Sequence, residues 1–162
     1  MDIAMVMEDV KYNFRVGAVL TYQNKILIEK SDASSFFVIP GGRVKLLEDT
    51  KSALIRELKE ELGIDISKID SQLISVIENF FVLRDVQFHE LYFIYKYDLT
   101  EDFGIKDGMV NLDSSSSKYY WKSLDELDNI EILPIKLKEV AKLSSFKKYV
   151  VRNWLNIKKK QH

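Results

Sequence analysis

Three glutamates, Glu57, Glu60 and Glu61, gather at the end of a predicted helix. An α-helix has about 3.6 residues per turn, so side chains at these spacings project from one side of it. The helix dipole opposes negative charge at this end and like charges one turn apart repel, so helix stability does not explain the arrangement. A hard divalent cation bound by the three carboxylates would explain the arrangement, and a set of oxygen donors favours Mg²⁺ or Mn²⁺. Because Mg²⁺ commonly takes substrate phosphates as further ligands, the glutamates predict metal-dependent phosphate chemistry.

An arginine adjoins this acidic group. Arg56 precedes Glu57, and a further carboxylate, Glu48, lies in the segment before the helix. A guanidinium can bind a carboxylate through two parallel hydrogen bonds, which fixes the geometry of both groups. We therefore expect Arg56 to pair with Glu48 across the loop or with Glu57 beside it, and to hold the site rather than contact the substrate.

The first half of the chain shows strand signals before the helix. A β-rich run at 14–22, a turn at 24–25 and a second run at 26–30 predict a hairpin. A short apolar run at 36–40 ends in proline, and the flexible pair Gly41-Gly42 follows it. These features lead the chain directly into the acidic helix.

The helix itself has clear boundaries. Asp49 or Thr50 can cap its N-terminus, and Gly63 is expected to end it in the left-handed conformation. Its apolar stripe consists of Ala53, Leu54, Leu58 and Leu62. The stripe and the glutamates occupy different sides, so one side should face a core and the other the site.

The second half is again rich in strands. Long β-rich runs at 71–83 and 86–99 predict an antiparallel pair at the centre of the sheet. Residues 100–117 lose periodicity and predict a long loop, and 118–127 predict a strand that leads into a short turn or helix. Pro134 can start a helix, so we expect a C-terminal helical extension over 134–158.

Composition excludes several classes of protein. A chain of 162 residues with 46% hydrophobic side chains is expected to form one domain over 1–162. Because 24 basic residues nearly cancel 25 acidic ones, neither nucleic acid nor a membrane surface is an expected partner. The absence of cysteine excludes disulfides and thiolate sites. With neither a signal-peptide pattern nor a long apolar run, we expect a cytoplasmic protein.

The segment from Gly42 to Ile64 resembles the Nudix box, G-x5-E-x7-R-E-U-x-E-E-x-G-U, where U is a bulky aliphatic residue. Every specified position is filled at the right spacing, by Gly42, Glu48, Arg56, Glu57, Leu58, Glu60, Glu61, Gly63 and Ile64. The stretch "VIPGG" before the box and "YYWKSLDEL" after it are also similar to family members. The chain thus looks like a member of the Nudix hydrolase superfamily, with a core at about 14–135.

The resemblance implies both a fold and a reaction. The fold is the Nudix-type α/β/α sandwich, a mixed β-sheet between helices. The reaction is metal-dependent hydrolysis of a pyrophosphate bond in a nucleoside diphosphate linked to another group. The expected partner is therefore a small nucleotide-type molecule, and the protein is expected to be a monomer or homodimer.

The resemblance also implies residue roles, which we carry over by position. The metal ligands would be Glu57, Glu60 and Glu61, with a backbone carbonyl of Gly41 or Gly42. Arg56 and Glu48 would be the supporting pair. The proton of the attacking water would pass to Glu60, to Glu61 or to a carboxylate outside the box.

Candidate substrate-binding residues lie mostly outside the box. Asp113 is either an extra carboxylate near the site or a turn residue, and Glu90 either faces the metals or is a solvated strand residue. Phe80 and Tyr92 could stack on a base or belong to the core. Lys45 could contact a phosphate or be solvated; it begins a Lys-Leu-Leu segment that departs from the commoner pattern, which has glycine at its third position.

Two alternative functions remain. A Nudix-like module could bind a nucleotide as a regulator without turnover, because a fold does not secure a function. The complete acidic set favours hydrolysis over this alternative. An RNA-end hydrolase would need a broad basic surface, which the near-neutral charge does not favour.

Overall fold

The computed structural model describes residues 1–153, and its elements lie within that range. The strands are β1 (Ala4–Met7), β2 (Val10–Tyr22), β3 (Lys25–Ser31), β4 (Gly41–Arg43), β5 (Gln72–Leu83), β6 (Val86–Asp98), β7 (Met109–Asn111), β8 (Ser114–Ser123) and β9 (Lys147–Asn153). The helices are α1 (Thr50–Leu62), the 3-10 helix η1 (Leu124–Asn129) and α2 (Leu137–Val140). Within residues 1–153, no helix combines the length and apolarity needed to cross a membrane.

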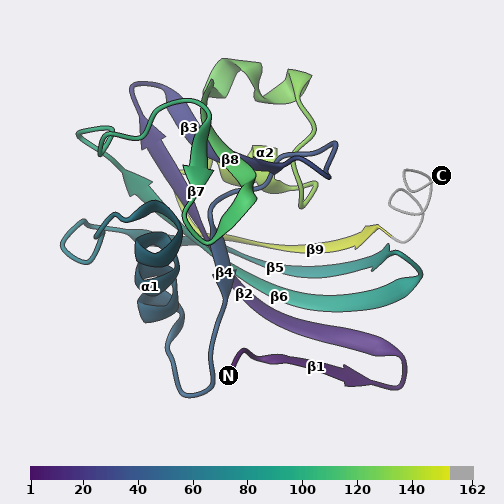
Figure 1. Ribbon diagram of the computed structural model, residues 1–162. Helices are drawn as coiled ribbons and strands as arrows, with labels where there is room; N and C mark the ends of the chain where they lie inside the picture. Colours follow the sequence, from purple (N-terminus) through teal and green to yellow (C-terminus); the bar gives the residue numbers. More distant parts are fainter. Residues whose placement is uncertain (154–162) are drawn as a thin grey trace.

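The strands form one mixed sheet in the order β7-β8-β3-β2-β6-β5-β9, and β1 and β4 also pair with β2. The pairs β2–β6 and β5–β9 are parallel, while β5–β6 and β3–β8 are antiparallel. Helices α1 and α2 lie on opposite sides of this sheet (Figure 1). The mixed sheet between helices confirms the predicted fold class.

Two apolar cores, one on each face, hold the sheet in place. Successive side chains of a strand point to opposite faces, so β2 and β3 contribute to both cores. The core under α1 contains Val16, Ala18, Leu20, Leu27, Leu54 and Leu58. The core under η1 and α2 contains Val19, Ile26, Ile28, Ile77, Leu127 and Leu137. Because both faces are buried, the strands that carry the polar residues described below are fixed in position.

Both predicted hairpins are present, and each turns through two residues at positive φ. In the β2–β3 turn, Gln23 and Asn24 have φ values of 49° and 61°, so this turn is one residue earlier than predicted. In the β5–β6 turn, Arg84 and Asp85 have φ values of 50° and 63°. Turns of this kind match the right-handed twist of paired strands, which explains their use here.

Helix α1 begins and ends as predicted. The Ser52 N–H donates to the Asp49 carboxylate at 2.9 Å and caps the first turn. At the other end Gly63 has a φ of 70°, and its N–H donates to the Lys59 carbonyl at 3.0 Å. All four residues of the apolar stripe are buried. The glutamates are therefore held on the side of α1 away from its core contact.

The loop predicted over 100–117 is shorter than expected. Strand β7 begins at Met109 and β8 at Ser114, so the serine run at 114–117 belongs to a strand. Composition indicated a loop because serine has little intrinsic preference for strands. Pairing with β3, which sets Ser117 opposite Ser31, overrides that local preference.

The helical extension predicted over 134–158 is wrong. Helix α2 is a single turn, and β9 then pairs in parallel with the edge of β5. The sequence "KKYVVRN" alternates, with Tyr149 and Val151 buried and Val150 half exposed, which suits a strand on a sheet edge. The last part of the predicted extension, 154–158, lies outside the described residues.

The Lys45-Leu46-Leu47 segment stores backbone strain. Leu47 has a φ of 64°, and its side chain is fully exposed. A residue with a Cβ pays roughly 1–2 kcal/mol for this left-handed conformation, and Leu47 gains no burial in return. The Lys45 N–H donates to a Glu48 carboxylate oxygen at 3.2 Å, which helps hold the turn.

We predict that Leu47→Asn stabilises the protein. Asparagine tolerates the left-handed conformation, so the free energy of unfolding should rise by about 1 kcal/mol, measured by urea denaturation. Leu46→Asn is the matched control, because Leu46 is also exposed but has no positive φ. Equal effects of the two substitutions would show that backbone strain at Leu47 is not the cause.

Candidate functional site

Arg56 is the centre of the polar network on α1. Its Nε and Nη2 donate to the two carboxylate oxygens of Glu48 at 2.8 and 2.9 Å, a bidentate pair. Its Nη1 donates to Glu57 at 3.0 Å and to Glu60 at 3.2 Å. Nη2 also reaches the carbonyl of Arg43 in β4 at 3.0 Å. Both predicted pairings of Arg56 are therefore present, and the same guanidinium joins helix, loop and strand.

These bonds shift the ionisation of both partners. The hydrogen bonds from Arg56 lower the pKa of Glu48 despite the burial of that carboxyl group. The same bonds, with those to Glu57, raise the pKa of Arg56. Both groups are therefore charged at neutral pH, and the pair is partly shielded from water.

The glycine pair Gly41-Gly42 allows a close approach of backbone to helix. Gly41 has a φ of 156°, and a Cβ at this position would overlap the Val16 carbonyl of β2. A Cβ on Gly42 would overlap the carboxylate of Glu57. The pairing of β4 with β2 thus sets the glycine backbone directly against one of the predicted metal ligands.

The three glutamates differ in environment. Glu57 and Glu61 are half-buried, whereas the Glu60 side chain is 41% exposed. Burial raises the pKa of Glu57. Burial, followed by the charges of Glu29 and Glu57, raises the pKa of Glu61 to about 8. The inner side of α1 therefore disfavours the charged forms of Glu57 and Glu61.

A chain of hydrogen bonds anchors Glu61 to the sheet. The Tyr119 hydroxyl in β8 donates to Glu61 Oε2 at 3.3 Å. Asn111 Nδ2 donates to that same hydroxyl and to Glu29 Oε1, both at 3.0 Å. Burial also raises the pKa of Glu29. Sequence reasoning missed these residues, because only the β3–β8 pairing, with Glu29 opposite Tyr119, brings them together.

The three glutamates of α1 offer oxygen donors that suit a hard cation, although their carboxylates do not converge on one point. Among residues 1–153, no three Asp, Glu or His side chains are grouped closely enough to hold a metal ion. Glu57 and Glu60 instead meet at a single nitrogen of Arg56. Burial raises the pKa of Glu57 and Glu61, so a bound cation would stabilise their charged forms, and oxygen donors fit Mg²⁺ or Mn²⁺. The ligand roles of Glu57, Glu60, Glu61, Gly41 and Gly42 stay predictions.

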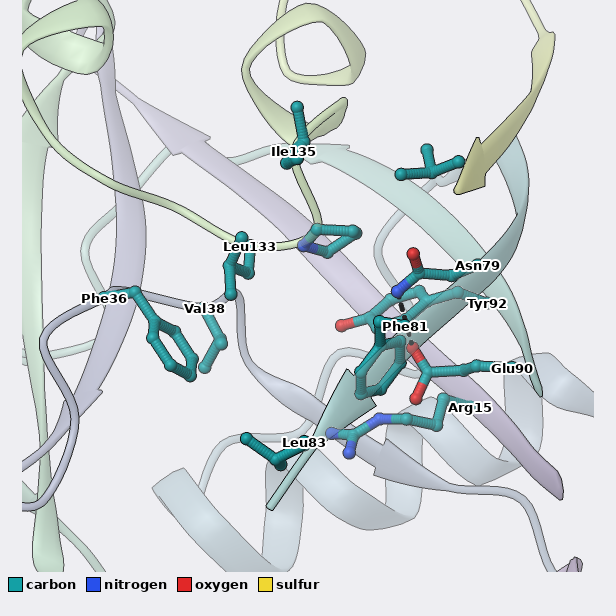
Figure 2. Close-up of a pocket in the computed structure, with 12 residues that line it drawn as sticks. Arg15, Phe36, Val38, Asn79, Phe81, Leu83, Glu90, Tyr92, Leu133 and Ile135 are labelled. Carbon is teal, nitrogen blue, oxygen red and sulfur yellow. Dashed lines mark hydrogen bonds between the residues drawn. The ribbon is translucent and has the colours of Figure 1, made fainter. Parts of the chain in front are cut away.

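A cavity of about 190 Å³ lies on the η1–α2 face of the sheet. Arg15 of β2 and the predicted residues Glu90 and Tyr92 of β6 line it (Figure 2). Phe80 does not, because it points to the other face and stacks on His89 with ring centroids 4.4 Å apart. Its neighbour Phe81 lines the cavity instead, and a role for Phe80 in base stacking stays a prediction.

Arg15 connects the cavity to the acidic helix, and sequence reasoning missed it. Burial alone would lower the pKa of this guanidinium, but Tyr92, Glu90, Glu61 and Glu57 together raise it. Its Cζ lies 5.8 Å from the centre of the Tyr92 ring. Arg15 lines the cavity and is opposite Arg43 of β4, whose carbonyl binds Arg56 of α1.

The two remaining predicted residues lie at the edge of the site. Asp113 is exposed in the β7–β8 turn, and its N–H donates to the Asn111 side chain at 2.7 Å, as a turn residue would. The next residue back, Leu112, donates its N–H to the Glu61 carbonyl at 2.9 Å, so this turn rests on the end of α1. Lys45 contributes a backbone contact to Glu48, and its side chain is partly exposed.

Comparison with known families agrees with this geometry. The NUDIX domain model matches residues 11–143. The chain belongs to the Nudix family. Its matched region contains the whole of α1, the glycine pair, and β5 and β6, which line the cavity.

Solved Nudix structures share the fold. A MutT protein from Bacillus halodurans superposes with a TM-score of 0.68 at 18% identity, covering 89% of this chain and 91% of the other. A MutT Nudix hydrolase from Burkholderia pseudomallei gives a TM-score of 0.61 at 20% identity, covering 83% and 98%. At such identities the likeness concerns the fold alone.

One relative has a higher sequence identity over a shorter stretch. An 8-oxo-dGTP diphosphatase from Proteus vulgaris is 33% identical over 67 residues, which make up 39% of this chain and 60% of that protein. The match therefore spans less than two thirds of the relative's length.

We predict that Arg56→Lys weakens the attachment of α1 to the preceding loop that carries Glu48. Lysine keeps the charge but cannot form the bidentate pair with Glu48, so the free energy of unfolding should fall by about 2 kcal/mol. Urea denaturation measures this change. Lys51→Gln, on the exposed side of α1, is the control and should stay within about 0.5 kcal/mol of the wild type. A similar loss in both variants would contradict the central role of Arg56.

Proposed function

We propose that this protein is a metal-dependent pyrophosphohydrolase that acts on a small nucleotide derivative, one in which a nucleoside diphosphate is linked to another group. The observation that carries the proposal is the desolvated pair Glu57 and Glu61, whose pKa values are raised beside the backbone of Gly42. Such a pair is costly without a cation, and a cation there can receive the phosphates of a substrate. The complete box in a chain of the Nudix family supports the same reaction.

The residues of this chain have separate roles in the proposed reaction. Glu57, Glu60 and Glu61 would hold Mg²⁺ or Mn²⁺, with a carbonyl of Gly41 or Gly42. The bound metal would neutralise the pyrophosphate and lower the pKa of an attacking water. Glu60 or Glu61 would accept the proton of that water, or a carboxylate outside the box would do so. Arg56 and Glu48 would position the ligands without touching the substrate.

The cavity beside Arg15 suits the other end of such a substrate. Its walls are mainly apolar, with few polar groups, as in pockets that bind small molecules. The 8-oxo-dGTP diphosphatase from Proteus vulgaris is named for a small nucleotide substrate, which supports the substrate class proposed here. A cytoplasmic location, and action as a monomer or homodimer without nucleic acid, complete the proposal.

We predict that purified protein with Mg²⁺ or Mn²⁺ hydrolyses at least one member of a panel of nucleoside triphosphates, nucleotide sugars, dinucleoside polyphosphates and ADP-ribose. Removing the metal with EDTA should abolish product release. Glu61→Gln should lower kcat roughly 10²-fold or more with an unchanged unfolding midpoint, because it removes a charge that the reaction requires. Chromatographic product analysis measures the turnover.

The control for that variant is Glu126→Gln, which changes an exposed glutamate of η1 far from α1 in the sequence. It should leave kcat unchanged. Full activity in both Glu60→Gln and Glu61→Gln would contradict the metal-site assignment. If no substrate is hydrolysed with either metal while a nucleotide still binds tightly, the protein is a nucleotide-binding module instead.

We also predict that Gly42→Ala weakens metal binding without unfolding the protein. The new methyl group would displace the Glu57 carboxylate, so the dissociation constant for Mn²⁺ should rise about 10- to 100-fold. Electron paramagnetic resonance of free Mn²⁺ measures it. Lys51→Ala, on the same helix but exposed, should bind Mn²⁺ as the wild type does. Equal affinities in both variants would argue against Glu57 as a ligand.

A further inference from the structure

Three polar side chains converge on the cavity from neighbouring strands. Arg15 comes from β2, Glu90 from β6 and Asn79 from β5. Asn79 and Glu90 are opposite each other in the β5–β6 register, and Glu90 is opposite Asn13 in the β2–β6 register. Figure 2 shows Asn79, Glu90 and Arg15 directed into the same cavity. The sheet therefore presents an amide, a carboxyl group and a guanidinium together on one face.

These groups are buried but incompletely satisfied. Glu90 is only 5% exposed and Asn79 8%. The hydrogen bond between them is long, at 3.5 Å from Asn79 Nδ2 to Glu90 Oε1. Arg15 Nε is buried with no hydrogen-bond partner. Because buried polar groups are nearly always paired, this set has capacity for a ligand that offers both donors and acceptors.

The walls of the cavity suit a flat ring. Phe36, Phe81 and Tyr92 surround it together with Val38, Leu83 and Leu133. Aromatic faces stack on any nucleobase, so the walls supply affinity without choosing between bases. The cavity volume of about 190 Å³ leaves room for a base.

The position of Arg15 sets the orientation of such a ligand. Arg15 lines the cavity and is opposite Arg43 in the β2–β4 register, and the Arg43 carbonyl accepts a hydrogen bond from Arg56 Nη2 of α1 at 3.0 Å. A base in the cavity would therefore leave its phosphates near the carboxylates of α1. The placement of the phosphates rests on the proposed function, whereas the binding of a base in the cavity does not.

We propose that Glu90, Asn79 and Arg15 read the base of the substrate, and that they select a base with a lactam edge, an N–H beside a C=O. Glu90 accepts a hydrogen bond from the ring N–H, and Arg15, which lines the cavity, donates from the terminal nitrogens of its guanidinium to the carbonyl oxygen. The Asn79 amide completes the edge as donor or acceptor. Guanine, hypoxanthine and uracil carry this edge, whereas adenine and cytosine lack the N–H beside a carbonyl.

The test measures binding without metal and without turnover. Isothermal titration calorimetry in EDTA compares GMP, IMP and UMP with AMP and CMP on the full chain. We expect the three lactam nucleotides to bind at least about 10-fold more tightly, as one good bidentate base contact allows. Tighter binding of GMP and IMP than of UMP would assign the cavity to purines. Equal binding of all five nucleotides, or preference for AMP, would overturn the proposal.

Paired variants identify the residues responsible. Glu90→Gln replaces an acceptor oxygen by a donor at nearly constant volume, and should lower the preference for GMP over AMP about 10-fold. The control is Glu78→Gln, because Glu78 lies on β5 but faces away from this cavity, where it pairs with Lys148 at 3.0 Å. An unchanged GMP preference in folded Glu90→Gln protein would overturn the role of Glu90.

A second pair of variants tests the cavity at an exposed position, so that the test does not depend on the folding of the buried Glu90→Gln variant. Ile135 lines the cavity yet is 43% exposed, so Ile135→Trp should fill the entrance and weaken binding of every base at least 10-fold without unfolding the protein. Val86→Trp, at the similarly exposed β5–β6 turn, should have no effect. If Ile135→Trp binds GMP normally, the base is elsewhere. Hydrolysis without base preference would refute this inference alone, and base preference without hydrolysis would refute only the proposed function.

Discussion

The bidentate pair between Arg56 and Glu48 is the interaction on which the site depends. It joins the end of the loop to α1, and the same guanidinium holds Glu57, Glu60 and the carbonyl of Arg43 in β4. A planar group with five donors can satisfy all of these acceptors at once, which a lysine could not. The glutamates thus keep one arrangement although their charges repel one another.

Burial gives the carboxylates their chemical character. Glu61 bonds to Tyr119 and Glu57 lies against Gly42, whereas the Glu60 side chain is 41% exposed. Desolvation destabilises the charged form of a carboxyl group unless a nearby cation or hydrogen-bond donors stabilise it. A bound cation would therefore stabilise the charged carboxylates on the inner side of α1. Arg15 contributes some of this stabilisation, and its side chain also lines the cavity on the η1–α2 face.

The local sequence pattern predicted helices and strands correctly where capping and turn residues marked their ends. The cap at Asp49, the terminator Gly63 and the two hairpins follow from short-range rules, and the structure confirms them. The errors fall where pairing between distant strands decides. The serine run became part of β8 because β3 lies beside it, and the expected C-terminal helix became β9 because β5 offered an open edge. The strained Leu47 could be suspected from the sequence, but only its φ establishes the strain.

The sequence alone determined the family resemblance, the fold class and the set of residues around Arg56, because these are encoded at fixed spacing along one helix and its loop. Tertiary structure alone decided what surrounds them. It selected Phe81 over Phe80 through the face of β5, set Glu29 near Glu61 through β3 and β8, and brought Arg15, Asn79 and Glu90 together from three strands. Strand register joins residues that lie far apart in the chain, and no local spacing records which strands will be neighbours.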